Sequence, residues 1–358
     1  MRTPTRRHFI ALASAGAVAG CGGQGGFSVV DPDHASAGAR ADVGAGVQQL
    51  LVATTRTADP APIAYGAGRA KTLDFARLAI SIPPNHEVGQ IERSRGSRAD
   101  PARHFALTGA ETLPDLEALV TAARATSTPG QEAVVFVHGY NNGFAKAAYR
   151  HAQVAWDYEL KGPQIHFSWS SAANPFEYTY DRDSVLIARD ALATLLRRLL
   201  REDGLRVSLV GHSMGGLLIM ETLRQIALSG DRALLDRLSA TTLISPDIDM
   251  DLFRAQAHAL GHLPQPFTVA IAQNDRLLRL SSGLSGGAAR LGSVEDLDQL
   301  EGLGVFVVDM TGIADTGSNH FLPGTSASAI ALIKGLRDAD ALAPQSLSVG
   351  PVSIKLGG

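Results

Sequence analysis

Short apolar runs alternate with amphipathic stretches along most of this chain. Short, largely apolar runs predict strands, here at residues 48–54, 75–82, 133–137, 164–169, 206–210, 241–244, 267–272 and 305–308, and the unbroken run at 133–137 is typical of a buried parallel strand. Apolar residues that recur every three or four positions predict helices, here at residues 115–124, 144–158, 183–200, 217–227 and 326–336. Because strands alternate with helices, we predict an α/β fold with a mostly parallel central sheet and helices on both of its faces.

The segments outside this alternation set the expected domain boundaries. Residues 1–20 have the character of an export signal, and residues 21–45, rich in Gly, Ala, Ser and Asp, are expected to form a flexible tether. Residues 46–340 carry the alternating pattern and are expected to form one α/β domain. Residues 341–358 lack this pattern and are expected to be a loosely packed C-terminal tail.

Composition and charge narrow the possible functions. The chain has 358 residues, 45% of them hydrophobic and 19% charged, and its net charge of −3 without a Lys/Arg tract argues against nucleic acid as a main partner. No apolar run approaches the roughly 20 residues that a membrane-spanning helix needs. Neither G-x-x-x-x-G-K-[ST] nor G-x-G-x-x-G occurs, and the pair His258 and His262 lacks the Glu of H-E-x-x-H. We therefore expect neither a cofactor nor a bound metal.

The N-terminal segment predicts export and lipid anchoring. Arg6 and Arg7 precede a short apolar segment over residues 9–20, and together they resemble a twin-arginine export signal. The segment leads to Cys21, the one cysteine of the chain, in a Val-Ala-Gly-Cys sequence that resembles a bacterial lipobox. We expect lipid on Cys21 to anchor the protein at the periplasmic side of a bacterial membrane, with Gly22 slightly favouring the outer membrane. The alternative is an ordinary signal peptide that happens to contain a cysteine.

A G-x-S-x-G sequence lies between a predicted strand and a predicted helix. It reads Gly211-His212-Ser213-Met214-Gly215. Only glycines fit beside the serine in so sharp a turn, which lifts the Ser213 Oγ clear of the strand end. The helix N-terminus behind it offers free N–H groups and a partial positive charge to a developing oxyanion. We therefore interpret Ser213 as a nucleophile. The alternative is a tight turn whose glycines serve only helix–sheet packing.

A nucleophilic serine needs a base to accept its proton and an acid to orient that base. His320 lies in a polar loop after the last predicted strand and is the candidate base, with a helix-capping histidine as the alternative. Asp275 directly follows the preceding strand, at the end where α/β sheets present functional groups, and is the favoured acid. Asp249 and Asp247, one strand earlier, remain alternatives, although both fit a helix N-cap or a turn.

Two backbone amides, those of Met214 and Tyr140, are expected to form an oxyanion hole. Tyr140 follows His138 and Gly139 directly after the predicted strand 133–137. Gly139 permits the turn and the close approach of a substrate. We expect His138 to orient this loop rather than to act as a second base.

Aromatic residues after the predicted strand 164–169 are candidates for an apolar substrate pocket. Trp169, Phe176 and Tyr178 flank Asn174-Pro175 in an expected loop at the carboxyl end of that strand. Such side chains suit an acyl pocket. Covering the edge of the sheet is an equally good explanation for them.

These motifs together resemble the α/β-hydrolase superfamily. Its landmarks are H-G-Y-N-N at residues 138–142, G-H-S-M-G-G at 211–216 and S-N-H at 318–320, and they occur in the expected order. From about residue 48 to 336 the chain further resembles a bacterial subgroup of uncharacterised esterase/lipase-like hydrolases. In that subgroup H-G-Y-N loops and S-P-D-I-D segments, here at 245–249, are familiar.

The resemblance implies an α/β-hydrolase fold without a large cap domain, because only residues 250–266 separate the two strands between which caps are common. It also implies a serine hydrolase that cleaves a small-molecule or lipid carboxylic ester through an acyl-enzyme intermediate. Two alternatives remain. One is amide or thioester cleavage by the same machinery, and the other is a catalytically silent, lipid-anchored binding module of the bacterial envelope.

Overall fold

The computed structural model of the protein describes residues 26–30, 44–59, 64–313, 319–338, 347–349 and 352–356. The expected export signal, Cys21 and residues 314–318 before His320 therefore lie outside the described residues. None of the described helices is both long and apolar enough to cross a membrane.

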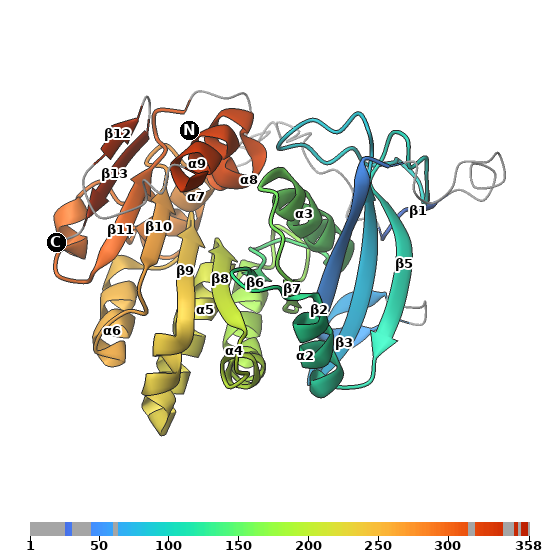
Figure 1. The fold of residues 1–358 in the computed structure, drawn as a ribbon. Helices are drawn as coiled ribbons and strands as arrows, with labels where there is room; N and C mark the ends of the chain where they lie inside the picture. Colours follow the sequence, from blue (N-terminus) through green and yellow to red (C-terminus); the bar gives the residue numbers. More distant parts are fainter. Residues whose placement is uncertain are drawn as a thin grey trace, which may run out of the picture.

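The described strands form one sheet in the order β12-β13-β11-β10-β9-β8-β6-β7-β2-β3-β5-β1-β4 (Figure 1). The strands from β11 to β2 in this order pair in parallel, whereas the pairs β2–β3, β3–β5, β11–β13 and β12–β13 are antiparallel. The predicted mostly parallel sheet is thus confirmed. The strand bounds are β1 Val29–Val30, β2 Gly46–Ala58, β3 Tyr65–Ile82, β4 Arg98–Ala99, β5 Ala106–Leu113, β6 Glu132–Val137, β7 Gln164–Ser168, β8 Arg206–His212, β9 Leu238–Ile244, β10 Phe267–Ile271, β11 Val305–Asp309, β12 Leu347–Val349 and β13 Val352–Leu356.

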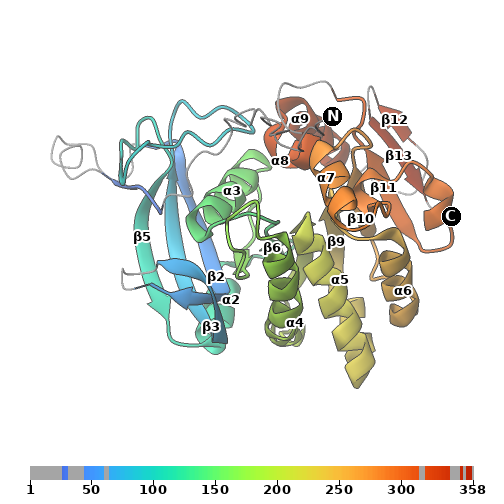
Figure 2. The ribbon, with the colours of Figure 1, turned by 180° about the vertical axis from the view of Figure 1, so that it is seen from behind.

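Helices cover both faces of the sheet, as predicted. The layer of α2, α4, α5 and α6 lies in the lower half of Figures 1 and 2, and α3, α8 and α9 lie in the upper half. The helix bounds are α2 Leu116–Thr126, α3 Phe144–Asp157, α4 Tyr178–Leu200, α5 Met214–Ile226, α6 Met250–Leu260, α7 Arg276–Leu284, α8 Leu322–Thr325 and α9 Ala327–Asp338. Between β9 and β10 the chain forms only α6 and short loops, which leaves no large cap at that connection.

The central strands explain why two helical layers are needed. In β6, Val135 and Val137 belong to the apolar core beneath α4 and α5, whereas Phe136 belongs to the core beneath α8 and α9. Successive side chains of a strand point to opposite faces, so an unbroken apolar run buries both faces of the sheet. The same arrangement holds in β8, where Leu209 and Val210 belong to these two cores in turn.

The two ends of the domain differ from the sequence expectation. Val29 and Val30, predicted within a flexible tether, form β1 beside β4 and β5. Leu347–Val349 and Val352–Leu356, predicted within a loosely packed tail, form β12 and β13, and β13 extends the sheet next to β11. Polar and apolar residues alternate in β13. This period-two pattern lacks the apolar run on which the strand predictions relied.

Several further elements were not predicted or were placed too short, among them β5, α7 and α4. β5 and α7 lack long apolar patterns, because β5 alternates Thr, Gly and Glu with its apolar residues and α7 contains two serines and a glycine. α4 begins at Tyr178 rather than at residue 183, so Tyr178 lies on a helix and not in a loop. These elements matter below because Tyr178 and α7 form part of a cavity wall.

Candidate active site

Ser213 occupies the turn between β8 and α5. Its backbone has φ 53° and ψ −121°, a conformation that residues other than glycine rarely adopt and that costs about 1–3 kcal/mol. The Ser213 amide donates to the Ile244 carbonyl of the neighbouring strand at 2.9 Å. A Cβ on Gly215 would lie 2.6 Å from the His138 carbonyl oxygen, so glycine lets α5 approach the loop after β6. The turn therefore has the geometry that exposes a serine Oγ at the carboxyl end of a strand.

The structure brings His320 and Asp275 into direct contact. His320 Nδ1 lies 2.7 Å from Asp275 Oδ2, and Asp275 is fully buried. The other oxygen, Oδ1, accepts from the amides of Leu277 and Leu278 at 2.9 and 3.1 Å and caps α7. Because a carboxylate can only accept a hydrogen bond, the proton of a neutral His320 ring lies on Nδ1. Its Nε2 is then left as a proton acceptor.

The two alternative acids make other contacts. Asp249 is the N-cap of α6 and accepts from the Leu252 amide at 3.1 Å. Asp247 is buried and accepts from Ser281 Oγ at 2.8 Å and from Tyr178 Oη at 3.0 Å. The geometry thus favours Asp275 as the partner of the imidazole.

The loop after β6 places Tyr140 in the same cavity as Ser213. No described residue accepts a hydrogen bond from the Tyr140 amide. Met214 is the first residue of α5, so its amide has no partner within the helix. A Cβ on Gly139 would lie 2.7 Å from His212 Nδ1 and 2.9 Å from Ser213 Cβ. Glycine therefore allows this loop to approach the serine closely, as an oxyanion hole requires.

Two buried polar residues, Asp181 and Arg56, form hydrogen bonds with the backbone of the loop after β6. Asp181 of α4 accepts from the amides of Asn141 and Ala172 at 3.2 and 2.6 Å. Arg56 of β2 donates to the Asn142 carbonyl at 2.6 Å, and burial lowers the pKa of its guanidinium to about 10. Asn141 has φ 55°, a left-handed conformation that asparagine adopts more readily than most residues. Neither Arg56 nor Asp181 belongs to a motif, and both are distant in sequence, so the sequence analysis missed them.

Two further histidines near the serine are buried and neutral. The His138 ring stacks on Trp169 at 4.9 Å, its Nδ1 donates to the Gly139 carbonyl at 2.9 Å, and burial lowers its pKa to about 3. A permanently neutral, packed ring suits the expected role of shaping this loop. His212 Nε2 donates to the His320 carbonyl at 3.2 Å, and burial lowers its pKa well below the usual value. His212 thus positions the His320 backbone, a role that the sequence analysis did not assign to it.

Ser213 and His320 line one cavity of about 570 Å³, a size typical of small-molecule sites. Of the three aromatic residues expected there, Tyr178 lines this cavity. Trp169 is fully buried behind the loop after β6, and Phe176 is 92% exposed. Neither of these two is among the described residues of the cavity wall.

Metal-ligand geometry is absent from the part of the chain that the structure describes. No group of three or more His, Cys, Asp or Glu there is arranged to hold a metal ion. His262, the second member of the i, i+4 histidine pair, contacts Asp236 Oδ1 at 3.2 Å and lies beyond the end of α6.

The fold and the site together define an α/β hydrolase. Residues 117–336 match the family model described as "Alpha/beta hydrolase of unknown function (DUF900)", which covers more than half of the chain, and the chain belongs to this family. An esterase from Pyrobaculum calidifontis is similar, with 14% identity, a TM-score of 0.38 and coverage of 84% of this chain and 87% of that one. An esterase from Rhizomucor miehei shows 13% identity, a TM-score of 0.36 and coverage of 86% and 88%. A search of the curated proteins found no significant match.

Proposed function

We propose that this protein is a serine hydrolase that cleaves carboxylic esters through Ser213, His320 and Asp275. The observation that carries the proposal is the strained Ser213 in a cavity with His320, whose Nδ1 contacts the buried Asp275 at 2.7 Å. Membership of the hydrolase family supports the same conclusion. A turn strained at one serine, beside an oriented imidazole, is expected where a nucleophile is needed.

The reaction proceeds in two halves. Ser213 Oγ attacks the ester carbonyl carbon while His320 Nε2 takes the hydroxyl proton, and Asp275 stabilises the resulting imidazolium. The amides of Tyr140 and Met214 donate to the oxyanion of the tetrahedral intermediate. His320 then protonates the leaving alcohol, and an acyl group remains on Ser213. In the second half, water replaces the alcohol, the same proton transfers repeat, and the carboxylic acid is released.

A fluorophosphonate probe tests the nucleophile directly. We expect the wild-type protein to be labelled and the Ser213→Ala variant not to be, with Ser127→Ala as a matched control on the C-cap of α2. Labelling that persists in Ser213→Ala would overturn the assignment. Matched p-nitrophenyl esters, anilides and thioesters then separate ester hydrolysis from amide or thioester cleavage. A protein that neither reacts with the probe nor turns over any of them would instead be a binding module.

We also propose that the hydrolase acts at the periplasmic side of a bacterial membrane, through the expected export signal and lipid on Cys21. Both lie outside the described residues, so the sequence alone supports this. The Cys21→Ser variant should move from the membrane fraction to the soluble periplasmic fraction. Wild-type protein found in the soluble fraction would contradict the anchor, and sedimentation of outer from inner membranes tests the preference for the outer membrane.

A further inference from the structure

Two helices flank the serine at the carboxyl end of the sheet. β8, which leads to Ser213, lies with β6 on one side and with β9 and then β10 on the other. α3 follows β6 and α7 follows β10, so these helices lie on opposite sides of the end of β8 (Figures 1 and 2). Both helices contribute side chains to the cavity that contains Ser213. The two walls can therefore be compared as the two sides of one substrate site.

The wall formed by α7 is apolar. Leu277, Leu280 and Leu284 line the cavity and are 50%, 63% and 64% exposed. Their spacing of three and four residues puts them on one face of α7. Exposed apolar side chains gathered beside a cavity mark a surface that binds an apolar ligand. Because this leucine face is continuous with the cavity of Ser213, the ligand it suits is an apolar part of the substrate itself.

The wall formed by α3 and the loop after β3 is cationic. Lys146 and Arg150 are four residues apart on α3 and line the cavity together with Arg93 from that loop. Asp247 is the one carboxylate among the described residues of the cavity wall. Arg290 Nε lies 3.4 Å from Asp247 and offsets its charge. The charged side chains of the cavity wall are therefore mainly cationic although the whole chain has a net charge of −3.

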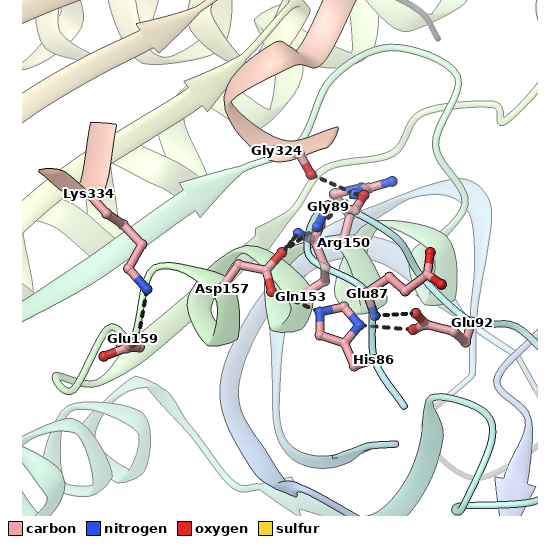
Figure 3. Close-up of polar contacts among 10 residues, drawn as sticks. All are labelled: His86, Glu87, Gly89, Glu92, Arg150, Gln153, Asp157, Glu159, Gly324 and Lys334. Carbon is pink, nitrogen blue, oxygen red and sulfur yellow. Dashed lines mark hydrogen bonds and ion pairs between the residues drawn. The ribbon is translucent and has the colours of Figure 1, made fainter. Parts of the chain in front are cut away.

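Arg150 has no anionic partner of its own among the described residues. Its Nη1 lies 2.8 Å from the Gly324 carbonyl, 3.1 Å from the Gly89 carbonyl and 2.5 Å from Gln153 Oε1, and all three acceptors are neutral (Figure 3). Asp157 is linked to Arg150 through Gln153 and through Gly89, whose amide donates to Asp157 at 2.7 Å (Figure 3). Burial lowers the pKa of Arg150 to about 10 and outweighs the nearby charge of Asp157, which raises it, so the group is charged at neutral pH. A largely desolvated cation that forms no direct ion pair is costly, and an anion in the cavity lowers that cost.

We propose that the substrate is an anionic amphiphile, an ester with an apolar chain against the leucine face of α7 and an anionic oxyacid group, such as a phosphate, against Arg150. Lys146 and Arg93 add to the positive potential around that group. The scissile carbonyl then lies between the two walls, at Ser213. This inference rests on the proposed ester hydrolysis, because it names the class of ester.

Binding of decyl phosphate below its critical micelle concentration tests both walls without any turnover. Calorimetry on wild-type protein should show that decyl phosphate binds with higher affinity than inorganic phosphate. Arg150→Gln should lower the affinity for decyl phosphate about 10-fold or more, because it removes a hydrogen bond to a charged group. Leu280→Glu should lower the affinity as well, because it places a charge on the apolar wall. Two controls make the same replacements at exposed positions outside the cavity, Arg254→Gln on α6 and Leu228→Glu after α5. Both should bind decyl phosphate like wild type. Unchanged affinity in Arg150→Gln would overturn the proposal.

Two further measurements keep the test decisive. Arg150 also links the loop after β3 to α8, so its variants are first checked by thermal unfolding. If Arg150→Gln does not fold, Lys146→Gln replaces it, with an expected loss of affinity of about threefold or more. Turnover of 1-decanoylglycerol 3-phosphate is then compared with turnover of 1-decanoylglycerol. Wild type should prefer the phosphorylated ester about 10-fold, and Arg150→Gln should lose that preference because it lacks the contact with the phosphate. A merely structural defect would instead lower both rates equally and leave the preference unchanged. Equal turnover of the two esters overturns this inference alone, whereas decyl phosphate binding without ester turnover overturns the proposed function and leaves the subsite standing.

Discussion

The two carboxylate oxygens of Asp275 make separate contacts, one with His320 and one with the N-terminus of α7. Oδ2 lies 2.7 Å from His320 Nδ1, and Oδ1 accepts the two amides that begin α7. One buried side chain therefore orients the imidazole and also sets the start of the helix that forms the apolar cavity wall. A substitution that keeps one contact and removes the other separates these roles.

Asp275→Ser is such a substitution. Serine is a good N-cap, so α7 should keep its start and the free energy of unfolding should change by about 1 kcal/mol or less. The serine cannot also reach His320, so kcat should fall about 10,000-fold, as expected when the imidazole loses the group that holds its tautomer. Ester turnover and urea unfolding measure the two effects on one preparation.

Asp249→Ser is the matched control, because Asp249 caps α6 by the same kind of hydrogen bond. It should unfold like Asp275→Ser and keep its activity. If Asp249→Ser were inactive while Asp275→Ser retained turnover, the acid would have to be reassigned.

The sequence predicted the sheet and the chemical landmarks of the site because both depend on local pattern. Short apolar runs located the central parallel strands, and polar residues in the loops beyond them gave the candidates Ser213, His320 and Asp275. Choosing between Asp275, Asp249 and Asp247 was a different matter. All three follow a strand, and only the packing of the loops decides which carboxylate meets the imidazole.

Features that depend on contacts far apart in sequence were not predictable. Arg56 and Asp181 support the loop after β6 from β2 and α4, and neither has a local signature. Arg150 also has no local signature, because its proposed role rests on its neutral hydrogen-bond acceptors and on the cavity that it lines. Trp169 was expected in the pocket because it follows a strand end, yet its indole donates to the His138 carbonyl at 2.7 Å and faces the loop instead.

Asp181→Ala should disturb the loop after β6, the proposed source of an oxyanion donor, without changing Ser213, His320 or Asp275. The change removes the acceptor of the Asn141 and Ala172 amides. The free energy of unfolding should fall by about 2 kcal/mol, and kcat should fall more than KM changes, because the loop is needed mainly in the transition state. Asp183→Ala, an exposed aspartate on the same helix, is the control and should resemble wild type. A variant with normal kcat would show that the loop holds its geometry without Asp181.

Gly139→Ala should inactivate the protein by moving the loop away from Ser213. The added Cβ would lie 2.7 Å from His212 Nδ1 and 2.9 Å from Ser213 Cβ, distances that force a shift. Displacing one oxyanion donor should lower kcat about 100-fold or more. Gly335→Ala is the control, because nothing lies within 4 Å of a Cβ there and Gly335 is within α9. It should keep full activity and gain about 0.5–1 kcal/mol of stability.

The stability contributed by His86 should depend on pH. His86 joins the loop after β3 to α3, with Nδ1 2.9 Å from Glu92 and Nε2 2.8 Å from Asp157 (Figure 3). Burial lowers the pKa of His86, but the hydrogen bonds and charges of Asp157 and Glu92 outweigh it, and the pKa in the folded state is raised above 6.5. The stabilisation is therefore complete below the unfolded pKa near 6.5 and is lost as pH rises through the folded pKa.

Urea unfolding of wild type and His86→Gln between about pH 5.5 and 9.5 measures this effect. Wild type should be more stable by about 1–3 kcal/mol at the acid end, and the difference should shrink as the imidazolium loses its proton. His262→Gln is the control, because the exposed contact of His262 with Asp236 should be worth less than about 1 kcal/mol throughout. A difference between wild type and His86→Gln that stays constant with pH would mean that a neutral His86 holds the loop. In that case the contacts with Glu92 and Asp157 would not be ion pairs.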